Sequence, residues 1–370
     1  MKVYIGIDAH STNYTLCSYI IEEDKSFYQI QVEPDYRKIV DYVKKIKELY
    51  GRKTEILTGY EAGCLGYTLY KQLTGKHINC VIMAPSTITT VQTNKKRRRK
   101  NDRRDAEAIA QALAFKQYKA VYICDDHDIE VRDYIRMRDD HKLQLKKLKQ
   151  QINAFCMRNG YVYTEGRKWT EKHIKWLRNV EMSVLQRETL DEYLLTFDVL
   201  SQRLADMTKR IEEISSEDRY KETVSKFRCL KGIDTLTALA LTSEVSDFNR
   251  FPKADSFAAY LGLVPGQDDS ANSRKDLPIT KAGNTHLRLL LVEAAQTYSR
   301  GSAYNKSKTL KAKQEGNDKE VIEYADKAQY RLTRKFKKMQ SRGVKYGIIT
   351  TAVARELACF VWGMATNHIN

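Results

Sequence analysis

The sequence has no CxxC pair, although it contains seven cysteines in 370 residues. The cysteines are scattered and odd in number, which argues against a disulfide framework and against a structural zinc site. This usage fits a reducing compartment such as the cytoplasm. The seven are Cys17, Cys64, Cys80, Cys124, Cys156, Cys229 and Cys359.

The sequence also lacks a signal-peptide layout and an uninterrupted apolar run of membrane length. The first residues, MKVYIGIDAH, lead directly into a predicted strand. The longest apolar stretch, residues 347–365, is interrupted by Arg355 and Glu356. We therefore expect a buried or docking helix there and no membrane partner.

Acidic residues are outnumbered, with 47 Asp and Glu against 64 Lys and Arg, which gives a net charge of +17. Hydrophobic residues make up 42% of the chain, so we expect a folded protein. The positive surplus indicates a polyanionic partner, most often nucleic acid. Ribosomal, chromatin and membrane-surface proteins are equally basic, so composition alone leaves these classes open.

Residues 1–126 alternate short predicted strands and helices. Two strands at 1–8 and 14–21 begin the series, and it ends with a helix at 102–115 and a strand at 120–123. A pair of neighbouring strands at the start, followed by alternating helices and strands, predicts a mixed α/β sheet covered by helices. The predicted elements between these ends are strands at 27–32, 54–61 and 78–84 and helices at 37–51 and 65–73.

Residues 127–221 have an almost wholly helical pattern. Apolar residues recur at alternating spacings of four and three, which is typical of coiled-coil packing. The pattern fits an internal helical hairpin and equally a dimerisation arm. Its members are Leu145, Leu148, Ile152 and Phe155, then Tyr193, Phe197, Leu200, Leu204, Met207, Ile211 and Ile214.

Residues 222–370 form a third, mainly helical region. Residues 229–245 predict two helices around a turn that contains Lys231 and Gly232, which resembles a DNA-binding helix-hairpin-helix. Many helical hairpins look alike, so this signal is moderate. We expect a polar loop at 265–278, a helix at 284–298 and a mobile polar insertion at 301–320.

Four carboxylates come from three separate segments of the first region. Asp8 and Glu61 each end a predicted strand, where adjoining loops leave side chains exposed in a crevice. Asp102 and Asp105 lie three apart at a helix start and so project from one face. Taken singly, Asp102 is an ordinary helix cap and Glu61 an ordinary surface residue.

Together, the four acids suit two-metal phosphoryl transfer. Mg²⁺ prefers hard oxygen ligands, and two ions stabilise both the attacking and the leaving oxygen. We therefore expect Mg²⁺ at Asp8, Glu61, Asp102 and Asp105, with Mn²⁺ as a substitute. We expect Arg103 and Arg104 to point away from the aspartates, toward phosphate. The basic run before them is a further predicted nucleic-acid contact: Lys95, Lys96, Arg97, Arg98, Arg99 and Lys100.

The segments IGIDAH, YEAG and KNDRRDAEAIA, in that order, resemble the three motifs of the DEDD-type transposases of insertion sequences, the group described as bridge-RNA-guided recombinases. The stretch FAAYLGLVPGQDDS…ITKAGNTHLRLLLVEAA is similar to their second domain. The likeness covers nearly the whole chain. It implies a RuvC-like (RNase H-like) first domain, a helical coiled-coil insertion and a family-specific C-terminal domain.

The resemblance further implies a serine nucleophile from the C-terminal domain. The interval from Pro265 to Lys281 has the family length, which places Ser270 at the matching position. Ala271 stands where the family has glycine, so Ser273 is the alternative. By its sequence alone, Ser270 is an ordinary loop serine.

The closing motif of the C-terminal domain contains three further candidates for nucleic-acid contact, Lys281, Asn284 and Arg288. We expect Asn284 to cap the helix that contains Arg288, with phosphate near the helix start. A solvated helix face explains Lys281 and Arg288 equally well.

The favoured hypothesis is a transposase that cuts and rejoins donor and target double-stranded DNA through a phosphoserine bond, which stores the bond energy. The resemblance alone adds a structured non-coding RNA partner, a prokaryotic cytoplasm and association with the nucleoid. Strand exchange between two duplexes needs several active sites, so we expect a dimer or tetramer. A resolvase-like nuclease that needs metal but no serine is the alternative, and a non-catalytic binder is the third hypothesis.

Overall fold

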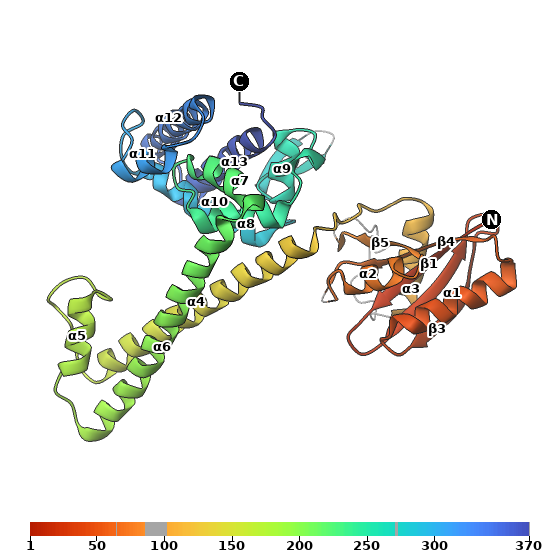
Figure 1. The fold of residues 1–370 in the computed structure, drawn as a ribbon, viewed down its shortest axis with the longest axis horizontal. Coiled ribbons are helices and arrows are strands. Elements are labelled where there is room, and N and C mark those ends of the chain that lie inside the picture. The colour runs from red at the N-terminus through yellow and green to blue at the C-terminus, as the bar shows by residue number, and fades with distance from the viewer. Residues whose placement is uncertain (64, 86–101, 271–272, 370) are drawn as a thin grey trace. The chain divides into compact units, whose positions relative to one another are not determined.

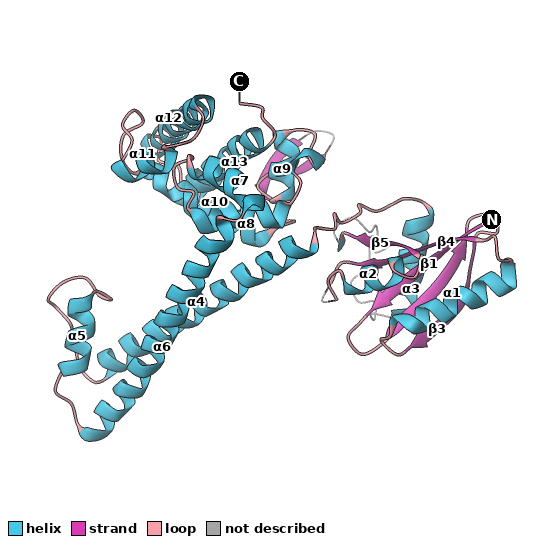
Figure 2. Ribbon diagram, viewed as in Figure 1, coloured by secondary structure: helices cyan, strands magenta, loops and turns pink. Residues whose placement is uncertain are grey.

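The computed structural model describes residues 1–63, 65–85, 102–270 and 273–369. These residues form two compact units, Met1–Ile123 and Cys124–Asn370 (Figure 1). Strands dominate the centre of the first unit, whereas the second is almost entirely helical (Figure 2). Each unit has a hydrophobic core of its own. The further division of the second unit into a helical region and a C-terminal domain remains a prediction.

The first unit is built on the predicted mixed sheet, with strand order β3-β2-β1-β4-β5. The strands β1, β2 and β3 are antiparallel neighbours, whereas β4 and β5 run parallel to β1. This arrangement is consistent with an RNase H-like fold. The strands are β1 (Lys2–Ala9), β2 (Tyr14–Ile20), β3 (Lys25–Val32), β4 (Glu55–Glu61) and β5 (Asn79–Met83).

Helices cover both faces of this sheet. Side chains alternate between the faces of a strand, so Val3, Ile5 and Ile7 of β1 share one face and Tyr4 and Gly6 the other. The odd-numbered residues pack in the core that includes α1 (Tyr36–Tyr50) and α2 (Thr68–Thr74). The even-numbered face packs against α3 (Asp102–Ala114).

The predicted last strand of this unit is reduced to a single bridge. Residues 120–123 contribute a single antiparallel bridge, between Ala120 and Met83, and do not form an extended ladder. One flanking hydrogen bond runs from Val121 N to Ile82 O at 2.8 Å. The segment therefore closes the edge of the sheet beside β5 without becoming a full strand.

In the second unit, α4 (Asp126–Arg158) and α6 (Val184–Ser215) lie side by side (Figure 1). Leu148 and Ile152 of α4 pack with Leu190 and Leu194 of α6, together with Leu177 of α5 (Glu171–Asn179). The apolar seam is therefore used within one chain, as an internal hairpin. A dimerisation role for its exposed residues remains a prediction.

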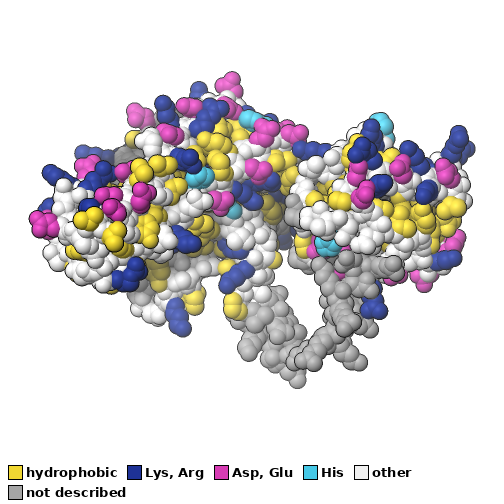
Figure 3. Space-filling model, turned by 90° about the horizontal axis from the view of Figure 1, so that it is seen from below, with side chains coloured by type: hydrophobic (Ala, Val, Ile, Leu, Met, Phe, Trp, Pro, Cys, Tyr) yellow, Lys and Arg dark blue, Asp and Glu magenta, His cyan; other side chains and the backbone are white. Residues whose placement is uncertain are grey.

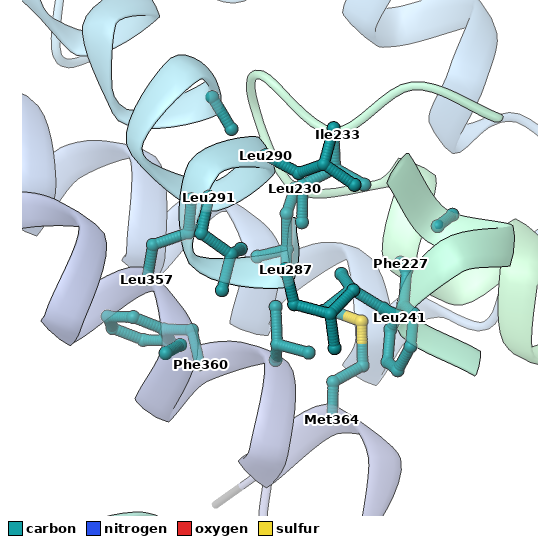
Figure 4. Close-up of a cluster of buried hydrophobic side chains, with 14 of the residues drawn as sticks. Phe227, Leu230, Ile233, Leu241, Leu287, Leu290, Leu291, Leu357, Phe360 and Met364 are labelled. Atoms are coloured by element: carbon teal, nitrogen blue, oxygen red, sulfur yellow. The ribbon is translucent and has the colours of Figure 1, made fainter. Parts of the chain in front are cut away.

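The remaining helices pack around one large core, part of which Figure 4 shows. Leu287 and Leu291 of α10 meet Leu357 and Met364 of α13 there. The helices are α7 (Asp218–Arg228), α8 (Thr235–Val245), α9 (Ala254–Tyr260), α10 (Thr285–Gln296), α11 (Lys308–Gln314), α12 (Lys319–Ser341) and α13 (Tyr346–Ala365), with short 3₁₀ turns η2 (Phe248–Arg250) and η3 (Thr297–Ser299).

The apolar stretch near the C-terminus is a core helix, as expected. By length and composition α13 would pass as a membrane span, with a mean hydropathy of 1.4 over its most apolar window. However, 56% of that window is buried inside the unit, and Ile349, Val353 and Val361 belong to the core.

Two predicted loops contain regular structure. The segment expected as a polar loop forms a hairpin of β6 (Pro265–Ser270) and β7 (Ser273–Ile279). The expected mobile insertion contains α11, whose Leu310 is buried and whose Gln314 donates to the backbone of Cys229 at 3.2 Å. Every described cysteine is a free thiol.

Candidate active site and nucleic-acid-binding residues

Asp8 and Glu61 lie at the ends of two neighbouring parallel strands. The register pairs Gly6 with Gly59 and Ile7 with Tyr60, so Asp8 and Glu61 are the next pair along β1 and β4. Asp8 lies two positions after Gly6 and Glu61 lies two positions after Gly59, so both acids belong to the same sheet face as these glycines. This is the face that α3 covers.

The helix α3 lies very close to this face because Gly6 has no side chain. A Cβ atom on Gly6 would stand 2.0 Å from the Ala106 carbonyl oxygen and 2.4 Å from the Ala110 nitrogen. A row of small residues, Ala106, Ala110 and Ala114, faces the sheet, and all three are buried. Glycine opposite alanine thus permits backbone contact between helix and strand.

The direction of α3 brings its first turn to the strand ends. Ala110 and Ala114 pack with Tyr4, near the start of β1, whereas Ala106 lies over Gly6. Continuing toward the helix start therefore leads toward Asp8. The structure thus places Asp8 and Glu61 side by side at the strand ends and directs the first turn of α3, which contains Asp105, toward the same edge. Asp105 is half-buried and Arg104 is exposed.

Several predicted residues lie wholly or partly outside this description. Asp102 is the first residue of α3, but its side chain and that of Arg103 are not among the described ones. Residues 95–100, the predicted basic contact, lie outside the described residues altogether. Their roles therefore stay predictions.

His10 contacts the first carboxylate. Its Nε2 lies 3.2 Å from Asp8 Oδ2, and the Asp8 side chain is only 14% exposed. The backbone N–H of His10 donates to Asn13 O at 3.0 Å, which holds the turn between β1 and β2. The contact of His10 with this carboxylate was not predicted from the sequence.

The described side chains do not by themselves form a closed metal cage. Among the described residues, no three His, Cys, Asp or Glu side chains are grouped as metal ligands. The donors do suit a hard divalent cation in kind, because Asp8, Glu61 and Asp105 all offer carboxylate oxygens at one edge. A metal ion shared by these carboxylates stays a prediction.

Ser270 ends β6, and its backbone partner across the hairpin is Ser273, the first residue of β7. The two candidate nucleophiles are thus neighbours at one end of the same hairpin. Beyond the other end of the hairpin, the backbone N–H of Asn284 donates to Tyr260 O at 3.0 Å. Gly283 has φ of +91°, and a Cβ there would stand 2.0 Å from the Tyr260 oxygen, so this closure requires glycine.

Asn284 caps α10, as predicted. Its Oδ1 accepts a hydrogen bond from Leu287 N at 3.0 Å. Arg288 is partly buried, and its guanidinium donates to Leu261 O at 2.9 Å and to Thr285 Oγ1 at 3.0 Å. Lys281 is exposed with φ of +55°. Contact of these three with nucleic acid remains a prediction.

A buried charge network was missed by sequence analysis. Glu244 of α8 accepts hydrogen bonds from Arg136 of α4 at 2.8 Å and from Asn284 Nδ2 at 2.6 Å. His286 bridges Glu244 at 2.5 Å and Asp139 of α4 at 3.0 Å. These side chains tie α4, α8 and the start of α10 together. No periodic pattern in the sequence signals such a network.

Of the two helices predicted within residues 229–245, only α8 lies there, because the preceding helix α7 ends at Arg228, and Lys231 and Gly232 lie in the turn between α7 and α8. Gly232 has φ of +90° and faces the Ala294 carbonyl of α10. Lys231 is half-buried, donates to Arg300 O at 2.8 Å and lies over the Tyr298 ring. Lys231 thus anchors the turn within the unit, and a phosphate contact there remains a prediction.

Two family models match the chain. The model described as "Transposase IS116/IS110/IS902 family" matches residues 224–310. A second, the DEDD domain described as "Transposase", matches residues 5–158. The first match includes the β6–β7 hairpin, and the second includes the strand ends with Asp8 and Glu61.

Curated relatives cover most of the chain. A transposase for insertion sequence element IS1533 from Leptospira borgpetersenii is 32% identical over 355 residues, which are 93% of this chain and 98% of the relative. A putative transposase, y4qE, from Sinorhizobium fredii is 32% identical over 87% of this chain and 78% of the relative. The chain therefore belongs to the IS116/IS110/IS902 family of insertion-sequence transposases, and it is a DNA transposase with a DEDD domain.

Proposed function

We propose that this transposase cuts and rejoins DNA strands through a transient phosphoserine bond, with Asp8, Glu61, Asp102 and Asp105 as the carboxylate group beside the reacting phosphate. The observation that carries the proposal is the register of β1 and β4 under α3. It supports a single edge for Asp8, Glu61 and Asp105, which are far apart in the sequence.

The DEDD domain implies a divalent metal, and the four carboxylates are the residues that would hold Mg²⁺ or, in its place, Mn²⁺. When bound, the metal would supply positive charge to the reacting phosphate. The acids would position it, while basic residues nearby would bind the DNA backbone. The predicted backbone contacts include Arg103, Arg104 and the run from Lys95 to Lys100.

The proposed covalent step involves Ser270. Its hydroxyl oxygen forms a bond to phosphorus while the bond from phosphorus to the leaving strand oxygen breaks, and the serine proton passes to that oxygen. The hydroxyl of a new strand then attacks phosphorus and restores the serine. Because one phosphoester replaces another, rejoining needs no ATP. The family resemblance supports this assignment.

The test is a strand-exchange assay with end-labelled DNA and the full-length protein. Asp8→Asn, Glu61→Gln and Asp105→Asn should each reduce exchange by about a hundredfold or more, the usual cost of removing one group that stabilises transition-state charge. A chelator should abolish exchange, and Mn²⁺ should restore it. Full activity in these variants would contradict the carboxylate assignment.

The serine is tested by trapping the protein–DNA adduct in a denaturing gel. The unaltered protein and Ser273→Ala should give the adduct, whereas Ser270→Ala should give none. Loss of the adduct in Ser273→Ala alone would transfer the role to that residue. Strand cleavage without any adduct would favour the resolvase-like nuclease.

We further propose that a structured non-coding RNA selects donor and target DNA and that the active assembly is a dimer or tetramer. The RNA proposal is supported by the family resemblance alone. The oligomer proposal is supported by the need for several active sites in an exchange between two duplexes. Base pairing would carry the sequence choice, while the protein holds backbones and shape.

A further inference from the structure

One face of α12 carries a stripe of cations. Four of its members, at positions 327, 331, 334 and 338, are spaced by four, three and four residues, as on one helix face, and all six line a shallow groove of about 820 Å³. From the first to the last cation the stripe is about 16 Å long, at 1.5 Å per residue. The cations are Lys327, Arg331, Arg334, Lys335, Lys337 and Lys338, and Tyr330 and Ser341 complete the lining. We call these residues the α12 stripe.

The stripe is only partly neutralised. Within the described part of the chain, one acid forms ion pairs with it: Glu356 of α13, which contacts Arg331 and lies 2.8 Å from Lys335 Nζ. Although burial would raise the pKa of Glu356, these two cations lower it. One carboxylate against six cations leaves a positive surplus, which attracts a polyanion.

The stripe reaches the turn between α7 and α8. Lys337 Nζ donates to Gly301 O at 2.9 Å, and Lys231 Nζ donates to the adjacent Arg300 O at 2.8 Å. Burial and the positive charge of Lys337 together lower the pKa of Lys231. The α12 stripe is therefore continuous with the helix-hairpin-helix turn. On the face drawn in Figure 3, by contrast, basic and acidic side chains are interspersed over both units.

An exposed aromatic pair adjoins these cations. Tyr304 is 76% exposed, and its ring meets Tyr330 edge-on with 5.2 Å between centroids. The guanidinium of Arg334 lies over Tyr330, 5.2 Å from the ring centroid. Tyr330 and Arg334 thus hold one another beside Tyr304, whose ring remains largely open to solvent.

Cations beside an open aromatic ring suit an unpaired nucleic-acid strand. Phosphates follow the cations, and a base stacks on the ring. In a duplex the base faces are stacked on one another, so only their edges are accessible in the grooves. Tyr304 would therefore have no stacking partner in intact double-stranded DNA.

We propose that the α12 stripe, with Tyr304 and Tyr330, binds an unpaired DNA strand, with phosphates on Arg334 and Lys338 and a base stacked on Tyr304. The choice of DNA follows from the family, because a DNA transposase must separate strands in order to exchange them. The proposal depends neither on the four carboxylates nor on Ser270.

Photo-crosslinking tests the location directly. The full-length protein is irradiated with a thymine-rich DNA strand of about 12 nucleotides, within the range of known single-strand sites, that contains 5-iododeoxyuridine. Mass spectrometry of the digest should find the crosslink on Tyr304 or Tyr330. A matched duplex should crosslink there much less. Crosslinks confined to other peptides, or equal or stronger crosslinking by the duplex or by an iodouridine RNA strand, would overturn the proposal.

Variants separate stacking from charge. Tyr304→Ala should lower the crosslink yield at Tyr330 and the affinity for the strand by about fivefold or more, the lower limit for loss of one stacked base, whereas Tyr304→Phe should keep both. Arg334→Gln with Lys338→Gln should reduce the slope of log affinity against log salt by about 1.4, or about 0.7 per phosphate.

The matched control is Lys308→Gln with Lys311→Gln. These residues lie on α11, are exposed and do not line the groove. The control removes the same charge and should leave the crosslink unchanged. An equal effect of the control pair would show that net charge alone is responsible, and the assigned site would be wrong. Because Tyr304 is largely exposed, a thermal melt should confirm that its variants fold.

Discussion

Glu244 remains ionised in the interior because its partners outweigh its burial. Its side chain is only 1% exposed. Burial alone would raise the pKa of Glu244, but hydrogen bonds from His286 and Arg136 lower it to about 2. Burial alone would lower the pKa of His286, but Asp139 and Glu244 raise it to about 9. The folded second unit thus contains a His286 imidazolium that is hydrogen-bonded to two carboxylates, Glu244 and Asp139.

This network predicts a loss of stability at high pH. The pKa of His286 is raised from 6.5, so its contribution to the free energy of unfolding is complete below pH 6.5 and is lost as the pH rises through about 9. In His286→Gln the fall in stability between neutral and alkaline pH should be smaller, by an amount on the order of 2 kcal/mol. Urea unfolding of both proteins at the two pH values measures this.

The comparison is internally controlled because other titrating groups are the same in both proteins. An equal loss at alkaline pH in His286→Gln would show that His286 is not the responsible group. At low pH Glu244 is the titrating group of this network. Its pKa is lowered from 4.5, so its contribution to the free energy of unfolding is lost as the pH falls from 4.5 toward 2.

At the scale of elements, the contact between α3 and β1 positions the candidate site. Gly6→Ala would place a methyl group 2.0 Å from the Ala106 carbonyl oxygen, so α3 would have to move away from the sheet. We expect a loss of about 2–3 kcal/mol in the free energy of unfolding of the first unit. DNA strand exchange should fall with it, since Asp105 would leave the edge that Asp8 occupies.

Gly63→Ala is the matched control in the same unit. Its added Cβ would have only the Glu61 carbonyl oxygen near it, at 3.9 Å. Its free energy of unfolding should change by less than about 0.5 kcal/mol. If Gly6→Ala is no less stable than Gly63→Ala, then backbone contact between α3 and β1 is not the constraint that positions Asp105.

Elements with a clear hydrophobic period were predicted from the sequence, and elements without one were not. The strands that begin at Lys2 and Tyr14 were recognised because their buried residues form short apolar runs. The hairpin of β6 and β7 was mistaken for a loop because PGQDDS and SRKDLPI show no apolar alternation. A hairpin with two residues between its strands depends on turn geometry and backbone pairing.

At the scale of the whole molecule, the net charge of +17 agrees with the DNA-directed activity of the family. In the described part of the chain, cations gather most visibly on the α12 stripe, where one acid pairs with them. Sequence analysis did not identify this face, because uncharged residues such as Ala328, Leu332 and Phe336 separate its cations in the sequence. The helical turn brings the cations to one side in space.

Guidance by the proposed non-coding RNA would involve the whole molecule. The purified full-length protein should exchange strands only when a transcript of the non-coding DNA beside its gene is added. Changing the predicted pairing segment of that transcript should redirect the product to a correspondingly changed target, because base pairing carries the choice. The control is a transcript of equal length and composition in scrambled order. Equal exchange with the scrambled transcript, or with none, would contradict RNA guidance.

The sequence by itself determined the mixed sheet, the long helices with their apolar seam and the residue types of the candidate site, because apolar periodicity and short motifs are local properties. Only the tertiary structure decided which of these residues share an edge. Strand register places Asp8 beside Glu61, and a glycine admits α3 close to the same sheet face. The Glu244 network and the α12 stripe likewise depend on contacts between distant segments, and burial and charge there are properties of the folded chain.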